Sequence, residues 1–220
     1  MSQFVFDYSK IPQQENAAGR LDAPTFHRNH DPIWSAIGPW LTQQDGDVLE
    51  IGSGTGQHIV AFARKAPRLT WWPSDILEAH LRSIEAWSAE AALSNLRKPQ
   101  ILDLTNAGWR PDGIEVPLTA IICINVLHIS PWSVSENLLS GAARLLRPGG
   151  RLFVYGPFMR DGVHTAPSNA SFDESLRAGN PDWGVRDIGE LSDVAVRHGL
   201  SAIEPTPMPA NNFVLTVIHA

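Results

Sequence analysis

The chain has 220 residues, a net charge of −6, 43% hydrophobic residues and 18% charged residues. These proportions are typical of a folded globular protein and exclude a disordered one. The acidic balance argues against a protein that binds a nucleic-acid backbone. The single cysteine, Cys123, excludes an internal disulfide and fits a reducing cytoplasm.

No targeting or membrane segment is expected. Residues 1–7 lack the basic start and apolar run of a signal peptide. The longest apolar stretch, residues 118–129, is too short to span a bilayer and is interrupted by polar residues. We therefore expect a cytoplasmic protein with no membrane partner.

Residues 1–30 are expected to form an N-terminal arm. Residues 1–26 are rich in polar residues and contain prolines, a composition that an arm lying over a site and a frayed tail would share. A helix is expected to begin at Asp31 and Pro32, because aspartate is a good N-cap and proline suits the first helical position.

From residue 47 onward, apolar segments of strand length alternate with segments of helical periodicity. The expected strands are residues 47–51, 69–75, 99–104, 120–126, 151–155, 201–204 and 213–218. This alternation predicts an α/β fold with a seven-stranded, mostly parallel sheet, an antiparallel edge hairpin and helices on both faces. Residues 156–187 show little periodicity and are expected to be an inserted, lid-like region within one domain that comprises residues 1–220.

The most informative stretch is residues 47–58, which combine a short apolar strand, a glycine-rich turn and the start of a helix. Glycines at alternate positions (Gly52, Gly54 and Gly56) allow a sharp turn and a close approach to a ligand. The helix that follows directs its free N–H groups toward the same space. A dinucleotide fingerprint would need a further glycine where Gln57 stands.

This G-x-G-x-G spacing, with Glu50 two residues ahead of it, resembles the first motif of class I S-adenosylmethionine-dependent methyltransferases. Asp75 lies 19 residues beyond Gly56, at a distance that suits an acceptor for ribose hydroxyls. Residues 145–150 (LLRPGG) resemble the segment that leads into the fifth strand of these enzymes.

The resemblance extends over nearly the whole chain. Residues 28–33, 56–58, 125–131, 180–187 and 208–212 resemble one branch of methyltransferase-like proteins of bacteria and animals that was first named as a domain of unknown function. The resemblance implies a Rossmann-like class I methyltransferase fold, S-adenosylmethionine as cofactor and methyltransferase activity. The cofactor-binding residues that it implies are Arg28, Asn29, Glu50, Gly52, Ser53, Gly54, Gly56, His58, Asp75, Ile76, Asp103, Leu104 and Asn125.

Several of these residues have a plainer alternative role. Glu50 is expected to accept from the methionyl amino group or to be a solvated acid at a strand end. Asp103 is expected to accept from the adenine amino group or to cap a turn. Asn125 either contacts the methionyl end or is an ordinary turn amide. His58 is expected to cap the turn or to contact the cofactor carboxylate.

Three residues are candidates for catalysis. His128 follows the fourth strand and titrates near neutral pH, so it is the first candidate for a base. Its alternative is a capping or packing role. Tyr155 and Asp173 are candidates for hydrogen-bonding or substrate-orienting groups. Arg186, like Arg28, either receives a carboxylate or forms a surface ion pair.

The expected acceptor is a small molecule. The fourth strand ends in Asn125-Val126-Leu127-His128, which differs from the motif that methyltransferases use on amino groups of nucleic-acid bases. The eight histidines show no tight ligand spacing, so no metal site is expected. The alternatives are a non-catalytic module that binds the cofactor and acts through a protein partner, and a protein or RNA methyltransferase.

Overall fold

The computed structural model describes residues 14–15, 19–114 and 117–220. The N-terminal part contains a short hairpin of two strands, β1 (Gln14–Glu15) and β2 (Leu21–Asp22), followed by helix α1 (Pro24–Leu41). Most of the predicted arm lies outside the described residues.

Helix α1 begins earlier than the sequence predicted. It starts at Pro24, and Asp31 and Pro32 lie inside it. Pro24 suits the first helical position as well as Pro32 does. The helix extends through Pro32 because Ile33, Ile37 and other residues of one face are buried against the core, and this packing outweighs the effect of an internal proline.

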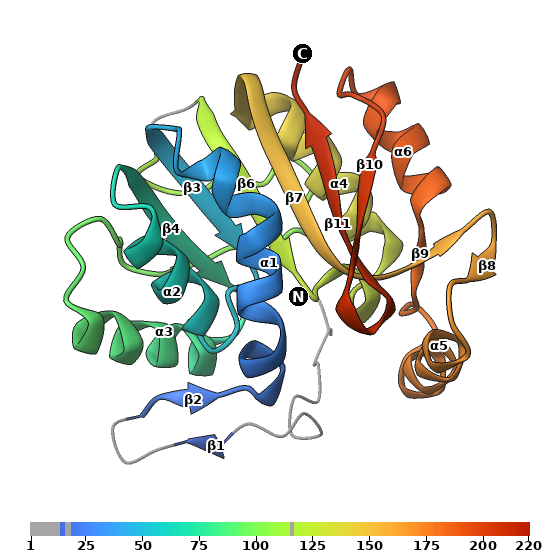
Figure 1. Ribbon diagram of the computed structural model, residues 1–220, viewed down its shortest axis with the longest axis horizontal. Coiled ribbons are helices and arrows are strands. Elements are labelled where there is room, and N and C mark those ends of the chain that lie inside the picture. Colours follow the sequence, from blue (N-terminus) through green and yellow to red (C-terminus); the bar gives the residue numbers. More distant parts are fainter. Residues whose placement is uncertain (1–13, 16–18, 115–116) are drawn as a thin grey trace.

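The rest of the chain alternates strands and helices (Figure 1). The strands are β3 (Gly46–Ile51), β4 (Leu69–Asp75), β5 (Gln100–Ile101), β6 (Leu118–Ile124), β7 (Leu146–Arg160), β8 (Val163–His164), β9 (Arg186–Asp187), β10 (Glu204–Met208) and β11 (Asn212–Ile218). The helices are α2 (Gln57–Lys65), α3 (Glu78–Ala91), α4 (Trp132–Leu145), α5 (Pro167–Gly179) and α6 (Ile188–Arg197), with 3-10 turns η2 (Leu127–Ile129) and η3 (Pro209–Asn211).

The main sheet comprises nine strands, and seven of them, the predicted number, lie side by side in the order β10-β11-β7-β6-β3-β4-β5. The short strands β8 and β9 pair only with β7. Strands β5, β4, β3, β6 and β7 run parallel to one another. Strand β11 is antiparallel to both β7 and β10, so the final hairpin inserts one strand of reversed direction. The prediction of a mostly parallel sheet with an antiparallel edge hairpin is confirmed.

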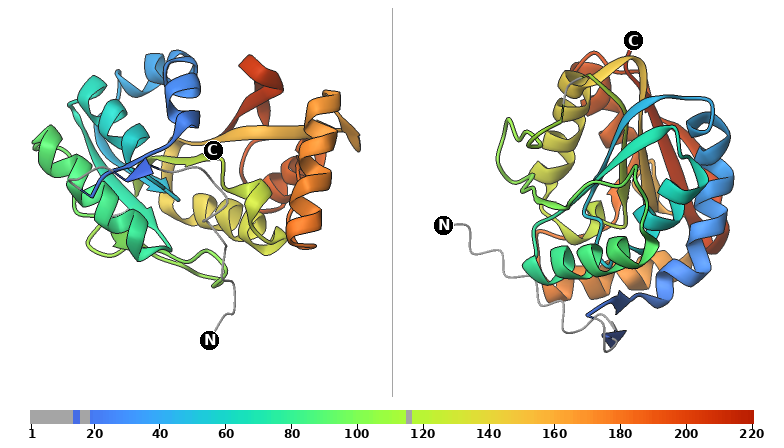
Figure 2. Two further views of the ribbon diagram at one scale, coloured as in Figure 1. Left: turned by 90° about the horizontal axis from the view of Figure 1, so that it is seen from below. Right: turned by 90° about the vertical axis from the view of Figure 1, so that its left-hand side faces the viewer.

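Helices cover both faces of this sheet (Figure 2, left). Helices α4 and α6 bury their apolar residues in one core, and helices α1 and α2 bury theirs in the other. Strand β6 is buried along its whole length because it lies between the two layers. In the described ranges, no helix has the length and apolar character needed to cross a bilayer.

The region of residues 156–187 has more regular structure than its sequence predicted. Strand β7 continues to Arg160 and pairs there with β8 and β9. Helix α5 comes between these two short strands in the sequence. The long β7 forms because it pairs with β6 and β11. These partners are distant in sequence, so the periodicity of residues 156–160 alone does not predict a strand.

The edge strands differ from their predicted ranges. Strand β10 comprises Glu204–Met208 where residues 201–204 were expected, and its two prolines are tolerated at an edge of the sheet. Strand β5 is limited to Gln100–Ile101 at the opposite edge, because the chain leaves the sheet toward Asp103.

Candidate functional site

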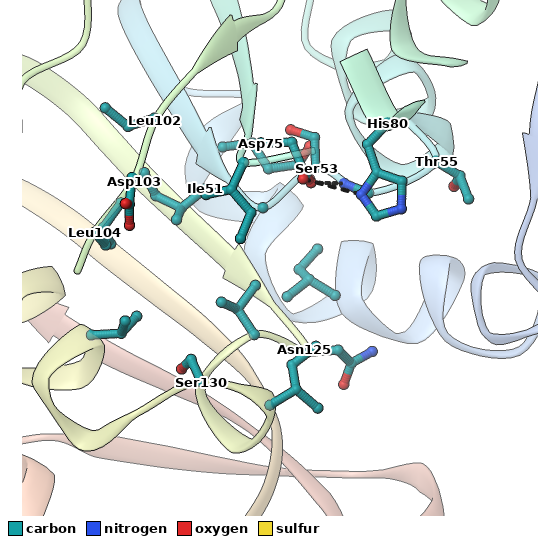
Figure 3. Close-up of a pocket in the computed structure, with 18 of the residues that line it drawn as sticks. Ile51, Ser53, Thr55, Asp75, His80, Leu102, Asp103, Leu104, Asn125 and Ser130 are labelled. Atoms are coloured by element: carbon teal, nitrogen blue, oxygen red, sulfur yellow. Dashed lines mark hydrogen bonds and ion pairs between the residues drawn. The ribbon is translucent and has the colours of Figure 1, made fainter. Parts of the chain in front are cut away.

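A cavity of about 260 Å³ lies at the carboxyl edge of the parallel strands (Figure 3). The ends of β3, β4 and β6 and the turns that follow them supply most of its wall. Strand β3 pairs with β4 on one side and with β6 on the other, so the chain connections diverge at this point. Ligands of open α/β sheets bind at such a divergence.

The glycine-rich turn forms one wall. Gly52, Ser53 and Gly54 line the cavity, whereas Gly56 does not. A Cβ atom built on Gly54 would meet nothing within 4 Å, so this residue presents bare backbone to open space. At Gly56, the same atom would lie 2.9 Å from the Cα of Ile84, so this glycine permits close packing of α3.

Asp75, at the end of β4, fastens this turn. Its carboxylate accepts hydrogen bonds from the backbone N–H of Gly54 at 2.8 Å and of Leu77 at 3.0 Å. Nδ1 of the buried His80 lies 3.1 Å from the same carboxylate, and Figure 3 shows the two side chains facing each other at the cavity wall. The prediction did not include His80, although its place five residues after Asp75, in the first turn of α3, was a usable signal.

Glu50, at the end of β3, is a buried acid at the cavity. Burial raises the pKa of its carboxyl to about 8, with the charge of Asp75 adding to the rise and a hydrogen bond with Ser53 opposing it. Its Oε2 atom has no hydrogen-bond partner among the described residues. Glu50 is therefore not the solvated strand-end acid of the alternative interpretation.

The residues after β5 form the opposite wall. Asp103 and Leu104 line the cavity, as does Ile76 from the turn after β4. Asp103 also accepts a hydrogen bond from the backbone N–H of Thr105 at 2.8 Å, so it caps a turn and lines the cavity at once.

Asn125 follows β6 with a φ of 58°, in the left-handed region that few residues other than glycine adopt. Its backbone N–H donates to the carbonyl of Tyr155 at 2.9 Å, and the residue lines the cavity. The strained backbone therefore turns Asn125 toward the cavity rather than along the strand.

His58 lines the cavity from the start of α2, and its Nε2 is 2.8 Å from Oδ1 of Asn29 in α1. Burial, together with the charge of His30, lowers the pKa of His58 to about 3, so its ring is neutral at physiological pH. Asn29 and the exposed Arg28 do not border the cavity, and Asn29 is linked to it by the contact with His58.

The three catalytic candidates also do not border the cavity. His128, in η2, packs edge-on against Phe172 with the ring centroids 5.3 Å apart. Burial and the charge of Arg186 lower the pKa of His128 to about 4. Burial raises the pKa of Tyr155, partly offset by hydrogen bonds with Asn29 and Asn212.

Asp173 supports the backbone of the segment of residues 180–187. Its Oδ1 accepts from the backbone N–H of Val185 at 2.6 Å, and its Oδ2 accepts from Nε of Arg177 at 2.9 Å. Burial tends to raise the pKa of Asp173, but these hydrogen bonds outweigh it and the pKa is lowered.

Arg186 anchors the same segment from the other side. Its guanidinium donates to the carbonyls of Leu127 at 3.1 Å and Asp182 at 2.9 Å, and to that of Ser130. The segment is thereby held against η2 and places Asn180 and Trp183 at the cavity. Asn180 was not predicted as a site residue, since only its tertiary neighbours bring it there.

Comparison with known proteins identifies the fold. A curated relative, the grayanic acid biosynthesis cluster O-methyltransferase of Cladonia grayi, is 24% identical over 184 residues, which are 79% of this chain and 37% of the relative. The structure of an O-methyltransferase family protein from Burkholderia thailandensis superposes with a TM-score of 0.75 at 17% identity, covering 89% of this chain and 57% of the other. The SAH-bound form of CalO1, a methyltransferase in calicheamicin biosynthesis, superposes with a TM-score of 0.65 at 16% identity, covering 89% and 56%.

The chain thus spans little more than a third of the curated relative and just over half of each of these structures. The structural likeness confirms the predicted Rossmann-like methyltransferase fold. The sequence matches the family described as "Protein of unknown function (DUF938)" over residues 20–219, and the chain belongs to this family.

Proposed function

We propose that the protein is an S-adenosylmethionine-dependent methyltransferase that acts on a small-molecule acceptor. The observation that carries this proposal is the cavity, in which a glycine-rich turn meets acidic residues from three successive strand ends. The methyltransferase fold and the names of the relatives support it.

The residues of the cavity fit a positively charged cofactor of this type. S-adenosylmethionine carries a sulfonium and an ammonium group, and three carboxyls (Glu50, Asp75 and Asp103) line the cavity. No lysine or arginine is among the described residues that line it. Without a ligand, Glu50 is protonated below about pH 8. A bound ammonium group beside its unpartnered Oε2 would favour the ionised carboxylate and satisfy this oxygen by donating a hydrogen bond to it.

Each cofactor-binding residue takes a role within this proposal. Asp75 accepts from the ribose hydroxyls and Asp103 from the adenine amino group, with Ile76 and Leu104 as apolar contacts for the adenine. Glu50 and Asn125 hold the methionyl end. Backbone groups of Gly52, Ser53 and Gly54 approach the ligand directly, and Gly56 and His58 hold the start of α2. Asn29 orients His58, and Arg28 adds a positive charge near Tyr155.

The cofactor supplies the methyl group on a sulfonium, so the protein mainly has to align donor and acceptor. An acceptor hydroxyl, amine or thiol that loses a proton needs a base, and we retain His128 in this role. Its lowered pKa leaves the ring neutral at physiological pH and able to accept a proton, although weakly. Tyr155 and Asp173 act as positioning groups, Asp173 through the segment of residues 180–187.

A small-molecule acceptor is favoured by the net charge of −6, which disfavours a nucleic-acid substrate, and by the name of the curated relative. We propose that the part of the chain comprising residues 156–187 covers the acceptor within a single domain of residues 1–220. A cytoplasmic location belongs to the same proposal and is supported by the single cysteine, Cys123, which is buried.

The test begins with calorimetry of the purified protein with S-adenosylmethionine, S-adenosylhomocysteine and NAD. We expect micromolar or tighter binding of the first two, and binding of NAD alone would contradict the proposal. The protein is then incubated with methyl-labelled cofactor and a metabolite extract, and the labelled product is identified by mass spectrometry. Binding without any transfer would favour the non-catalytic module, and label found only in protein or RNA would favour the other alternative.

A further inference from the structure

The segment of residues 20–25 lies at the cavity although it precedes the sheet by more than twenty residues. It comprises β2 and the start of α1, and Ala23 and Thr25 are among the residues that line the cavity. In Figure 1, β2 lies below α3, on the side of the molecule toward which β3 and β4 point. We call residues 20–25 the cover segment.

Gln57 connects the cover segment to the glycine-rich turn. This side chain is 4% exposed. Its Oε1 accepts from the backbone N–H of Ala23 at 2.8 Å and from the hydroxyl of Thr55 at 2.9 Å. Its Nε2 donates to Oδ1 of Asp22 at 2.6 Å. One amide therefore binds the cover segment twice and the cavity wall once.

Ser83, in α3, makes a second connection of the same kind. Its hydroxyl accepts from the backbone N–H of Leu21 at 2.9 Å and donates to the carbonyl of Thr55 at 2.8 Å. Nε1 of Trp87 donates to the carbonyl of Leu21 at 2.9 Å. Thr55, a residue of the cavity wall, is thus linked to the cover segment through two different side chains.

The cover segment is held by these polar contacts, and by Arg20, which pairs with Glu90 and lies over the ring of Trp87, rather than by burial in the core. None of residues 20–25 is fully buried, and Pro24 and Thr25 are exposed. A segment with few buried apolar contacts detaches at a lower free energy than the core unfolds. A ligand that contacts both the turn and the cover segment will stabilise the attached state, because it binds that state better.

We propose that Gln57 is a positioning residue that fastens the cover segment over the bound cofactor, so that cofactor release requires the segment to detach. This inference rests on the proposed function. It also gives a physical role to the residue that stands where a dinucleotide fingerprint would have glycine.

The test uses the full chain and S-adenosylhomocysteine as the probe. We measure its release rate by stopped-flow displacement, and the amide hydrogen exchange of residues 20–25 with and without it. In the wild type, exchange should slow when the probe binds. Gln57→Ala should release the probe about tenfold faster, since it removes two hydrogen bonds to the cover segment. Gln43→Ala, in the turn that follows α1, is the matched control and should leave the rate unchanged.

Two further variants separate fastening from a general loss of stability. Gln57→Glu places a second carboxylate beside Asp22 and should accelerate release at least as much as the alanine variant. The pair Gln57→Glu with Asp22→Asn exchanges donor and acceptor, since the new amide at position 22 donates to the new carboxylate. It should return the release rate to within about threefold of the wild type.

The outcomes distinguish the two proposals. If the wild type does not bind S-adenosylhomocysteine, the proposed function fails. If it binds, but Gln57→Ala and Gln57→Glu release it at the wild-type rate, the fastening role of Gln57 is wrong. The fastening role is also wrong if Gln57→Glu releases the probe faster and the paired variant does not restore the rate. In that case the faster release would reflect a general disturbance of the glycine-rich turn.

Discussion

At the scale of single residues, the buried carboxyl of Glu50 makes the stability of the fold depend on pH. Its pKa is raised to about 8 by burial, against an ordinary value of 4.5. The folded protein therefore keeps this proton up to about pH 8, whereas the unfolded chain loses it near pH 4.5. The contribution of Glu50 to the free energy of unfolding is therefore most favourable below pH 4.5. It is lost progressively as the pH rises from 4.5 toward 8.

Replacing Glu50 with glutamine should remove this pH dependence. Between pH 5 and pH 8, the wild type should lose on the order of 4 kcal/mol of unfolding free energy through Glu50, and Glu50→Gln should not. Urea unfolding at the two pH values measures the difference between the variants, with the exposed Glu174→Gln as control. If the free energy of unfolding changes equally with pH in the wild type and in Glu50→Gln, Glu50 ionises with an ordinary pKa and the prediction is wrong.

At the scale of elements, two physical reasons favour glycine in the glycine-rich turn: a positive φ and a lack of space for a Cβ atom. Gly54 and Gly56 both have positive φ, 56° and 89°, so a side chain at either position strains the backbone. Only at Gly56 does a Cβ atom also meet backbone, at 2.9 Å from the Cα of Ile84.

Alanine at these two positions should therefore have different effects. Gly54→Ala should destabilise the protein by about 1 kcal/mol through backbone strain, and should weaken S-adenosylhomocysteine binding because the new methyl group enters the cavity. Gly56→Ala should destabilise by about 3 kcal/mol, since overpacking is added to the strain. Urea unfolding and calorimetry on both variants measure this. The packing argument is wrong if the two variants unfold at the same urea concentration.

At the scale of the whole molecule, β6 is a central strand that contributes side chains to both cores. Ile121 is 0% exposed and belongs to the core under α4 and α6, and the next residue, Ile122, is 1% exposed and belongs to the core under α1 and α2. Successive side chains of a strand point to opposite faces of the sheet.

Truncation at either position should thus be costly. Ile121→Ala and Ile122→Ala should each reduce the unfolding free energy by about 2–5 kcal/mol, because each leaves a cavity in a packed core. Ile101→Ala, at a position 61% exposed, should change it by less than about 0.5 kcal/mol. Denaturant titration of the three variants is the measurement, and a small effect at either β6 position would mean that one layer packs loosely.

The sequence by itself determined the central strands and the acidic residues at the ends of three of them. Apolar runs such as 120–124 and the spacing of Gly52, Gly54 and Gly56 depend on short-range chemistry, which a local pattern records. Because parallel strands end at one edge, Glu50, Asp75 and Asp103 could be placed together before the fold was known.

Only the tertiary structure decided what surrounds this edge. The early start of α1, the long β7, and the contacts of Gln57 with the cover segment depend on partners distant in sequence. The same holds for His80 at the cavity and for His128, which is not among the residues that line it. The physical reason is that a strand end has its direction set by the sheet, whereas the position of an arm, a loop or a helix start is set by long-range packing and side-chain hydrogen bonds, which no short segment encodes.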